Sequence, residues 1–224
     1  MKVIQATKIR KTYHRPSESL EVLSGINLQV TKGEIVLITG RSGAGKTTLL
    51  KIIGCMELPT SGTLKILDTD TTQLTLEELT QLRAKYFGFI FQSFNLLPAL
   101  TVTENIELPL AIRGTSRAQR KKAAEQVLGQ FELGYLAQRL PEELSTGQIQ
   151  RVAVMRALIT EAPILIADEP TANLDKENTV SLFALLQEVN ANRQSTIVIC
   201  SQKNLAREYA DAVYRMEGGR LKPV

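Results

Sequence analysis

Residues 34–50 read EIVLITGRSGAGKTTLL, and this stretch decides the fold. Its first part, EIVLIT, is apolar enough to predict a strand buried on both faces, as the strands of parallel sheets are. The segment GRSGAGKT at residues 40–47 has two glycines at the spacing of a phosphate-binding loop, followed by Lys and Thr. A helix is expected from about Lys46 to Gly54. Strand, glycine loop and helix in this order are what a phosphate site requires.

Each residue type in the loop suits the binding of phosphate. Glycines let the backbone curl, so that successive N–H groups and the start of the helix point at phosphate oxygens. Lys46 supplies a positive charge, and the Thr47 hydroxyl is a ligand for Mg²⁺. The residues predicted to contact the nucleotide here are Gly40, Arg41, Ser42, Gly43, Ala44, Gly45, Lys46, Thr47 and Thr48.

The rest of the chain predicts an α/β fold with a mainly parallel sheet. Before the loop, strands are expected at 2–9 and 21–30; after it, at 63–67, 87–91, 164–168 and 195–200. Helices are expected at 76–86, 179–191 and 204–210, and a hairpin around Gly218 and Gly219. Between about 93 and 160 the pattern changes to helices alone, over 103–112, 116–131 and 147–159, which indicates an inserted helical lobe within one domain of 224 residues.

Composition limits the possible functions. The net charge of +4 comes from 27 basic and 23 acidic residues spread along the chain, so no nucleic-acid partner is expected. The basic cluster at residues 117–122 is either a plain surface helix or a face that leans toward an anionic membrane.

Cys55 and Cys200 lie in apolar stretches without metal-type spacing, which indicates buried thiols in a reducing compartment. The N-terminus lacks signal-peptide features, and no apolar run is long enough to span a bilayer.

Two further segments carry chemistry. ILIADEP at residues 164–170 places Asp168 and Glu169 at the end of a buried strand, at the edge where ligands of open α/β sheets lie. We expect Asp168 to hold Mg²⁺ and Glu169 to polarise the attacking water, although two acids that cap a helix are the alternative. The stretch beginning LSTGQ at Leu144 has a serine and a glycine at the start of an amphipathic helix, which makes a second anion site.

The order of the phosphate loop, FQSFNLLPALT, LSTGQ, ILIADEP and TANLD resembles the ABC (ATP-binding cassette) ATPases over essentially the whole chain. Within that family, the stretch from FGFIFQSF to IELPL is similar to the ATPases of lipoprotein release, macrolide export and FtsE-type cell division. The resemblance implies a RecA-like P-loop NTPase core with an antiparallel β flank and the helical lobe. It also implies binding and hydrolysis of ATP with Mg²⁺.

The resemblance also implies roles for residues outside the loop. Tyr13 matches the aromatic that stacks on adenine, with an exposed loop aromatic as the alternative. Gln92 matches the glutamine that senses Mg²⁺ and the membrane partner. Asp175, in TANLD, matches the loop that lines the dimer seam, and it also suits an N-cap of the following helix. The remaining residues match the signature that caps the γ-phosphate held by the opposite subunit: Ser145, Gly147 and Gln148.

The chain departs from this family at two positions. Where the family carries a histidine that contacts the γ-phosphate, CSQKN provides Gln202, and the only histidine is His14. An amide donates a hydrogen bond but does not titrate near neutral pH, so slow hydrolysis is expected. Thr146 replaces a glycine of the signature, which matters only if the backbone there needs a positive φ.

The resemblance implies that two copies pair head to tail and drive an integral membrane permease, with the homodimer as the expected form. The protein is then cytoplasmic and peripheral on the inner face of the cell membrane. A regulatory ATP switch in cell division is the alternative, and the Gln202 departure favours it modestly. A soluble DNA-repair or translation protein of the family is disfavoured, because its coiled-coil, zinc or tandem modules do not fit in 224 residues.

Overall fold

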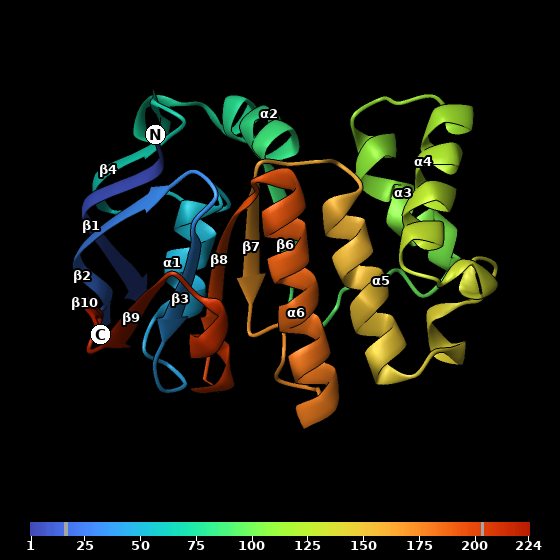
Figure 1. Cartoon of the computed structure of the whole chain (residues 1–224). Coiled ribbons are helices and arrows are strands. Elements are labelled where there is room, and N and C mark those ends of the chain that lie inside the picture. The colour runs from blue at the N-terminus through green and yellow to red at the C-terminus, as the bar shows by residue number, and fades with distance from the viewer. Residues whose placement is uncertain (16–17, 203) are drawn as a thin grey trace.

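The computed structural model describes residues 1–15, 18–202 and 204–224, arranged as two sheets and a group of helices (Figure 1). The smaller sheet is antiparallel, in the order β2-β1-β4-β5. Its strands are β1 (Lys2–Arg15), β2 (Glu18–Thr31), β4 (Ser61–Ile66) and β5 (Thr69–Asp70). It forms the antiparallel flank that the resemblance implied.

The larger sheet has the order β10-β9-β3-β8-β7-β6 and is parallel except for the β9–β10 hairpin. Its strands are β3 (Ile35–Thr39), β6 (Phe87–Ile90), β7 (Ile164–Asp168), β8 (Thr196–Ser201), β9 (Ala212–Glu217) and β10 (Arg220–Pro223). In register, Thr39 lies opposite Ser201, and Asp168 lies opposite Cys200. The carboxyl ends of β3, β7 and β8 therefore meet at one edge.

The helices follow the expected positions closely. They are α1 (Lys46–Ile53), α2 (Leu76–Tyr86), α3 (Val102–Ile112), α4 (Arg117–Gln130), α5 (Thr146–Leu158) and α6 (Lys176–Arg193). Capping boxes at Thr75, Thr101 and Ser145 fix the starts of α2, α3 and α5, because each side chain accepts a hydrogen bond from the first turn. Short 3₁₀ turns lie at Thr71–Gln73, Gly134–Leu136, Pro141–Glu143 and Asn204–Tyr209.

One expected element is different. The stretch 204–210 was predicted as an α-helix, and the structure has the 3₁₀ helix η4 (Asn204–Tyr209) there. Residues 202–211 connect the end of β8 to the start of β9, and short connections of this kind are where 3₁₀ geometry is used.

Alternate residues of the central strands face opposite sides of the larger sheet and pack into two separate parts of the core. Val36 and Ile38 face α1 and the antiparallel sheet, whereas Leu37 and Ile199 face α5 and α6. A third apolar cluster joins α3, α4 and α5 within the helical segment. Figure 1 shows α3 and α4 at the far end of the molecule from the antiparallel sheet, with α5 next to them and α6 lying over the strands.

Both cysteines are buried and free. Burial raises the pKa of Cys55 to about 12 and raises the pKa of Cys200 well above its ordinary value. Neither thiol forms a thiolate at neutral pH, which agrees with the expectation of inert buried cysteines.

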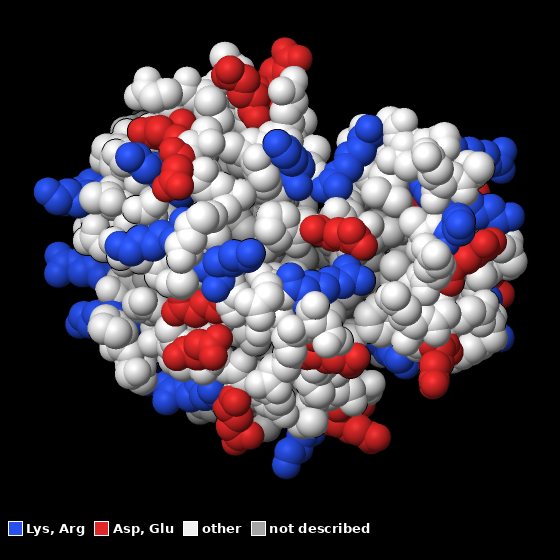
Figure 2. All heavy atoms as spheres, turned by 45° about the horizontal axis from the view of Figure 1, so that its top comes forward, with Lys and Arg blue, Asp and Glu red and all other residues white. Residues whose placement is uncertain are grey.

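Charged side chains of both signs are interspersed on the face drawn in Figure 2, and neither sign forms a continuous field there. The basic cluster at residues 117–122 lies on α4. Two of its side chains contact acids: Arg120 lies 3.3 Å from Glu107, and Lys121 lies 3.9 Å from Glu125. In the described part of the chain, none of the helices combines the length and the apolar character needed to cross a bilayer.

Two glycines give opposite predictions for stability. A Cβ at Gly88 of β6 would lie 2.5 Å from the carbonyl oxygen of Ala157 and 2.7 Å from Leu165 Cδ2, whereas a Cβ at Gly129 of α4 would meet nothing within 4 Å. We expect Gly88→Ala to lower the free energy of unfolding by about 2 kcal/mol through overpacking. Gly129→Ala should raise it by about 0.5–1 kcal/mol, because alanine is the better helix former. Urea unfolding of both variants measures this, and a Gly88→Ala variant as stable as the parent contradicts the packing of α5 on β6.

Candidate functional site

The loop between β3 and α1, residues 40–45, which we call the cradle, turns tightly at its glycines. Gly45 precedes α1 with a φ of 100°, a left-handed conformation that favours glycine. Gly40 comes so close to the neighbouring strand that a Cβ would lie 2.5 Å from the Met216 carbonyl oxygen. Both glycines are therefore required by the path of the backbone. Because α1 starts at Lys46, the positive end of its dipole points into the loop.

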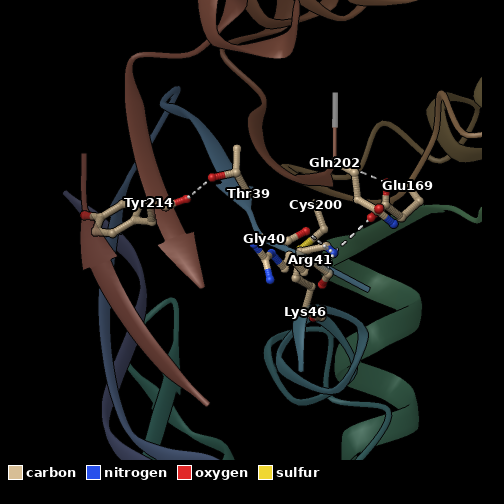
Figure 3. Close-up of polar contacts among 8 residues, drawn as sticks. All are labelled: Thr39, Gly40, Arg41, Lys46, Glu169, Cys200, Gln202 and Tyr214. Atoms are coloured by element: carbon tan, nitrogen blue, oxygen red, sulfur yellow. Dashed lines mark hydrogen bonds and ion pairs between the residues drawn. The ribbon is translucent and has the colours of Figure 1, made fainter. Parts of the chain in front are cut away.

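Lys46 is buried at the centre of the site, as Figure 3 shows. Its Nζ donates hydrogen bonds to the carbonyl oxygens of Gly40 (2.8 Å) and Arg41 (3.2 Å). It also lies 3.1 Å from Oε1 of Glu169, and both side chains are at most 9% exposed. The ammonium is therefore held where the phosphate loop turns, next to the acid that follows β7.

Glu169 and Gln202 meet from the tips of β7 and β8. The Gln202 backbone N–H donates to Oε2 of Glu169 over 3.1 Å, and the Glu169 N–H donates to the Cys200 carbonyl over 2.9 Å (Figure 3). Glu169 has a φ of 45°, which is unusual for a residue with a side chain. Strained backbone of this kind clusters at functional sites. The Glu169 carboxylate is thus held by Lys46 and by the Gln202 N–H, and the Glu169 backbone is held by the Cys200 carbonyl.

Asp168 has the properties of a metal ligand. Its Oδ1 is buried without a hydrogen-bond partner among the described residues. Burial raises the pKa of Asp168, the neighbouring Glu169 charge raises it further, and a hydrogen bond from Thr47 and the Lys46 charge oppose the rise. A free carboxylate oxygen next to a threonine hydroxyl fits Mg²⁺, which prefers a few oxygen ligands and its own waters.

A cavity of about 780 Å³ opens along the phosphate loop. Besides Thr39 and residues 40–44 of the loop, its lining includes Gln202 and the β9–β10 turn at Gly218 and Gly219. It extends to residues 20–22 of β2. Arg207 and Arg215, two arginines outside the predicted site residues, also line it. No motif surrounds either residue, so only the fold brings them to the site.

The signature residues lie elsewhere in the same chain. Ser145 and Gln148 form the capping box of α5, and Gln148 Nε2 donates to the Tyr135 hydroxyl over 3.4 Å. A Cβ at Gly147 would lie 2.8 Å from Asn178 Oδ1, so a larger residue here would require the Asn178 side chain to shift. None of the three residues is in the lining of the phosphate-loop cavity. Thr146 has no positive φ and begins α5, so the replacement of glycine is unstrained.

Tyr13, Gln92 and Asp175 are also absent from the lining of the phosphate-loop cavity, as are Gly45, Lys46, Thr47, Thr48, Asp168 and Glu169. The Tyr13 hydroxyl donates to Glu57 Oε2 over 3.0 Å, and the ring is half-buried. Gln92 lies two residues beyond β6, is exposed, and accepts a hydrogen bond from Asn173 at its backbone oxygen. Asp175 caps α6 by accepting from the Asn178 N–H over 2.8 Å, so the N-cap alternative is correct for it.

Comparison with known proteins places these features in one family. The sequence profile described as "ABC transporter" matches residues 23–172. The chain is 39% identical to the bacitracin export ATP-binding protein BceA of Halalkalibacterium halodurans, over 99% of this chain and 87% of that protein. It is also 39% identical to the macrolide export ATP-binding/permease protein MacB of Brucella melitensis, over 98% of this chain but only 34% of that protein. The chain thus spans about a third of the length of the macrolide export relatives it matches.

Solved structures agree with the sequence comparison. The dimeric structure of MJ0796, described as a bacterial ABC transporter cassette, superposes with a TM-score of 0.91 at 37% identity, and covers 98% of this chain and 96% of that one. A second structure of MJ0796, in a dimeric post-hydrolysis state bound to ADP and Pi, matches equally well.

The contact between Lys46 and Glu169 predicts a strong energetic coupling. Lys46→Met leaves the buried Glu169 charge without its ammonium partner, and breaking a buried pair in this way should lower the free energy of unfolding by about 3 kcal/mol. In the double variant with Glu169→Gln, much of this loss should be recovered, because no buried charge is left unpaired. Guanidinium unfolding of the two single variants and the double variant without nucleotide measures the coupling. Additive losses would show that the two side chains do not interact.

Proposed function

The chain belongs to the ABC transporter family, and on this premise we propose that it is the ATP-hydrolysing cassette of an exporter, in which two copies close on ATP and drive a membrane permease. The observation that carries the proposal is the buried edge where Lys46, Glu169 and the free oxygen of Asp168 gather beside the glycine loop. This group of residues offers backbone amides, one cation and two acids to a triphosphate, which is the requirement for phosphoryl transfer to water.

In this proposal the loop binds the nucleotide through its main chain. The N–H groups of residues 43–48 and the α1 dipole stabilise the phosphate oxygens. Lys46 already lies against the cradle, so its ammonium needs only to exchange the carbonyls of Gly40 and Arg41 for phosphate oxygens. Tyr13, at the end of β1, is the proposed adenine contact, which requires its hydroxyl to leave Glu57 or its ring to stack from the present position.

The two acids after β7 have different proposed roles. Thr47, Asp168 and Gln92 are the proposed Mg²⁺ ligands, and the ion when bound neutralises the phosphate charge that develops during cleavage. Glu169 is the proposed base that orients the attacking water and polarises it. Without nucleotide its carboxylate lies against Lys46 and the Gln202 N–H. Once phosphate draws the ammonium away, one of these contacts is released and the carboxylate is free to hold water.

A second copy is needed to complete the site. Ser145, Gly147 and Gln148 lie at the start of α5, outside the phosphate-loop cavity of their own chain. In a head-to-tail pair, the start of α5 in one subunit faces the γ-phosphate in the other, and Asp175 lies at the seam. ATP then contacts both subunits only in the closed pair, which is the differential affinity that a ligand-driven switch needs.

The helical lobe at about 93–160 is the proposed transmitter to the permease. Arg156 of α5 donates to the backbone oxygens of Phe94 and Asn95, both of which have positive φ. The helix that starts with the signature is thereby tied to the segment that follows Gln92. A rotation of α5 on closure of the pair moves this segment with it, toward or away from a partner docked there.

The names of the relatives support export. Bacitracin export and macrolide export are the printed roles of two relatives. We propose a cassette at the inner face of the cell membrane, held there by a permease partner. A regulatory switch in cell division was the alternative, and none of these relatives favours it.

The proposed function is tested first by nucleotide binding. Lys46→Ala should abolish measurable retention of ATP with Mg²⁺, because it removes the only buried cation that contacts the loop among the described residues. Glu169→Gln should still bind ATP, and it should form a dimer that size-exclusion chromatography detects with ATP but not with ADP. Lys65→Ala, in β4 and away from the loop, is the control. Equal ATP retention by Lys46→Ala and the parent protein would reject the proposal.

The effect of Gln202 is a separate prediction. We expect turnover to be slower than in Gln202→His, since an amide provides one hydrogen bond to phosphate and no imidazole that titrates near neutral pH. The gain should appear in kcat, with the KM for ATP changed less, because the contact is strongest in the transition state. Steady-state ATPase assays of both forms measure it, and equal rates would refute the idea.

A further inference from the structure

Arg207 lies in the wall of the cavity that follows the phosphate loop, although no motif points to it. It is on η4, five residues after Gln202, and both residues line the cavity with Thr39 and residues 40–44. The fold thus brings a guanidinium to the place where the sequence predicts phosphate and where the family histidine is missing.

The Arg207 side chain has a donor that nothing pairs. Its Nε is buried, and within the described residues no hydrogen bond or ion pair involves its side chain. Arg113 and Arg120 also have one buried nitrogen each without a hydrogen-bond partner, but their guanidinium groups donate to the carbonyls of Thr160 and Thr115. No such bond is found for the Arg207 guanidinium among the described residues. A buried donor without a partner is unfavourable, so an acceptor that enters the cavity and bonds Arg207 Nε would remove this cost.

The acceptor that fits best is a phosphate. A guanidinium presents its N–H groups as a planar fork that matches phosphate oxygens, and the bonds are strengthened by charge. Glu21 and Glu217 also line the cavity, but both are exposed and neither forms an ion pair with Arg207. An anionic ligand within the cavity remains as the partner.

The position of Arg207 indicates which part of a bound nucleotide it would contact. It shares its wall with Gln202, whose N–H lies 3.1 Å from Glu169. Glu169 in turn lies 3.1 Å from Lys46. Neither residue lines the cavity, but Gln202 joins it to them, so the Gln202 side of the cavity is the side nearest to where the proposed function places cleavage of the γ-phosphate. Gln202 carries no charge there. We propose that Arg207 binds the γ-phosphate and makes the cassette prefer ATP over ADP, an inference that rests on the proposed function.

Two other arginines allow a direct contact between Arg207 and phosphate to be distinguished from a general attraction of anions to positive charge. Arg41 and Arg215 line the same cavity, but both are exposed. Their charges attract every nucleotide through solvent and are screened by salt. Only the half-buried Arg207 is placed to distinguish nucleotides with and without the third phosphate.

The experiment measures the affinities for ATP and ADP, each with Mg²⁺, by isothermal titration calorimetry in the Glu169→Gln background, which prevents hydrolysis. Protein concentrations are kept where size-exclusion chromatography shows a monomer. The variants are Arg207→Ala, Arg207→Lys and Arg215→Ala, with Arg220→Ala on β10 as a surface change of equal charge outside the cavity. Thermal melts show whether each variant is folded.

We expect Arg207→Ala to lower the ratio of ATP to ADP affinity roughly tenfold, the size of one charge-assisted hydrogen bond. Arg207→Lys should restore part of the ratio, because it keeps the charge but loses the fork. Arg215→Ala should weaken both nucleotides alike and leave the ratio unchanged. Adding Gln202→His to Arg207→Ala should raise the ratio again below pH 6.5, where imidazole is charged.

Three results would overturn the inference: an unchanged ratio in folded Arg207→Ala and Arg207→Lys, equal falls in Arg207→Ala and Arg215→Ala, or a loss that affects ATP-driven dimer formation alone. The last result would show that Arg207 contacts the second subunit. If the background variant itself binds no ATP, the proposed function fails, which is a different outcome.

Discussion

The site depends on one constraint, the meeting of three parallel strand ends at a single edge of the sheet. Lys46 follows β3, Glu169 follows β7 and Gln202 follows β8, so residues far apart in sequence come within hydrogen-bond distance. A buried ammonium and a buried carboxylate each need a partner, and here each is the partner of the other. The glycines of the loop then serve this arrangement, because only they allow the chain to turn tightly enough for the start of α1 to face the same edge.

Much of the fold was predictable because its signals are local. The strands of the parallel sheet are continuous apolar runs, and the helices are bounded by capping residues such as Thr75 and Thr101. The antiparallel flank was predicted too short: β1 extends to Arg15, whereas its pattern indicated an end near residue 9. Register shifts interrupt the pairing of β1 with β2, and Lys8 has a φ of 50° at one of them. A bulge breaks the alternation of polar and apolar residues, so the continuation of the strand is hidden from sequence.

The site was predictable in parts for the same reason. The loop and the acids after β7 are compact segments whose chemistry is complete within a few residues. Arg207 has no such context, and its relation to the phosphate loop exists only because η4 folds back over the sheet edge. Asp175 matched two descriptions, and the structure shows that it caps α6. Sequence does not reveal which contacts a side chain such as Tyr13 makes without nucleotide, because its partner Glu57 lies in a distant connection, between α1 and β4, that shares no motif with β1.

The two departures from the family pattern differ in what they change. At Thr146 the side chain is exposed and the backbone is helical, so the N–H groups at the start of α5 are presented as they would be with glycine. The next residue is more restricted, since a Cβ at Gly147 would require the Asn178 side chain to move. At Gln202 the backbone N–H still holds Glu169, and only the group offered to the ligand has changed. Both departures therefore leave these main-chain contacts in place and change only a side chain, and Arg207, which lines the same cavity as Gln202, is the residue we propose to supply a charged donor there.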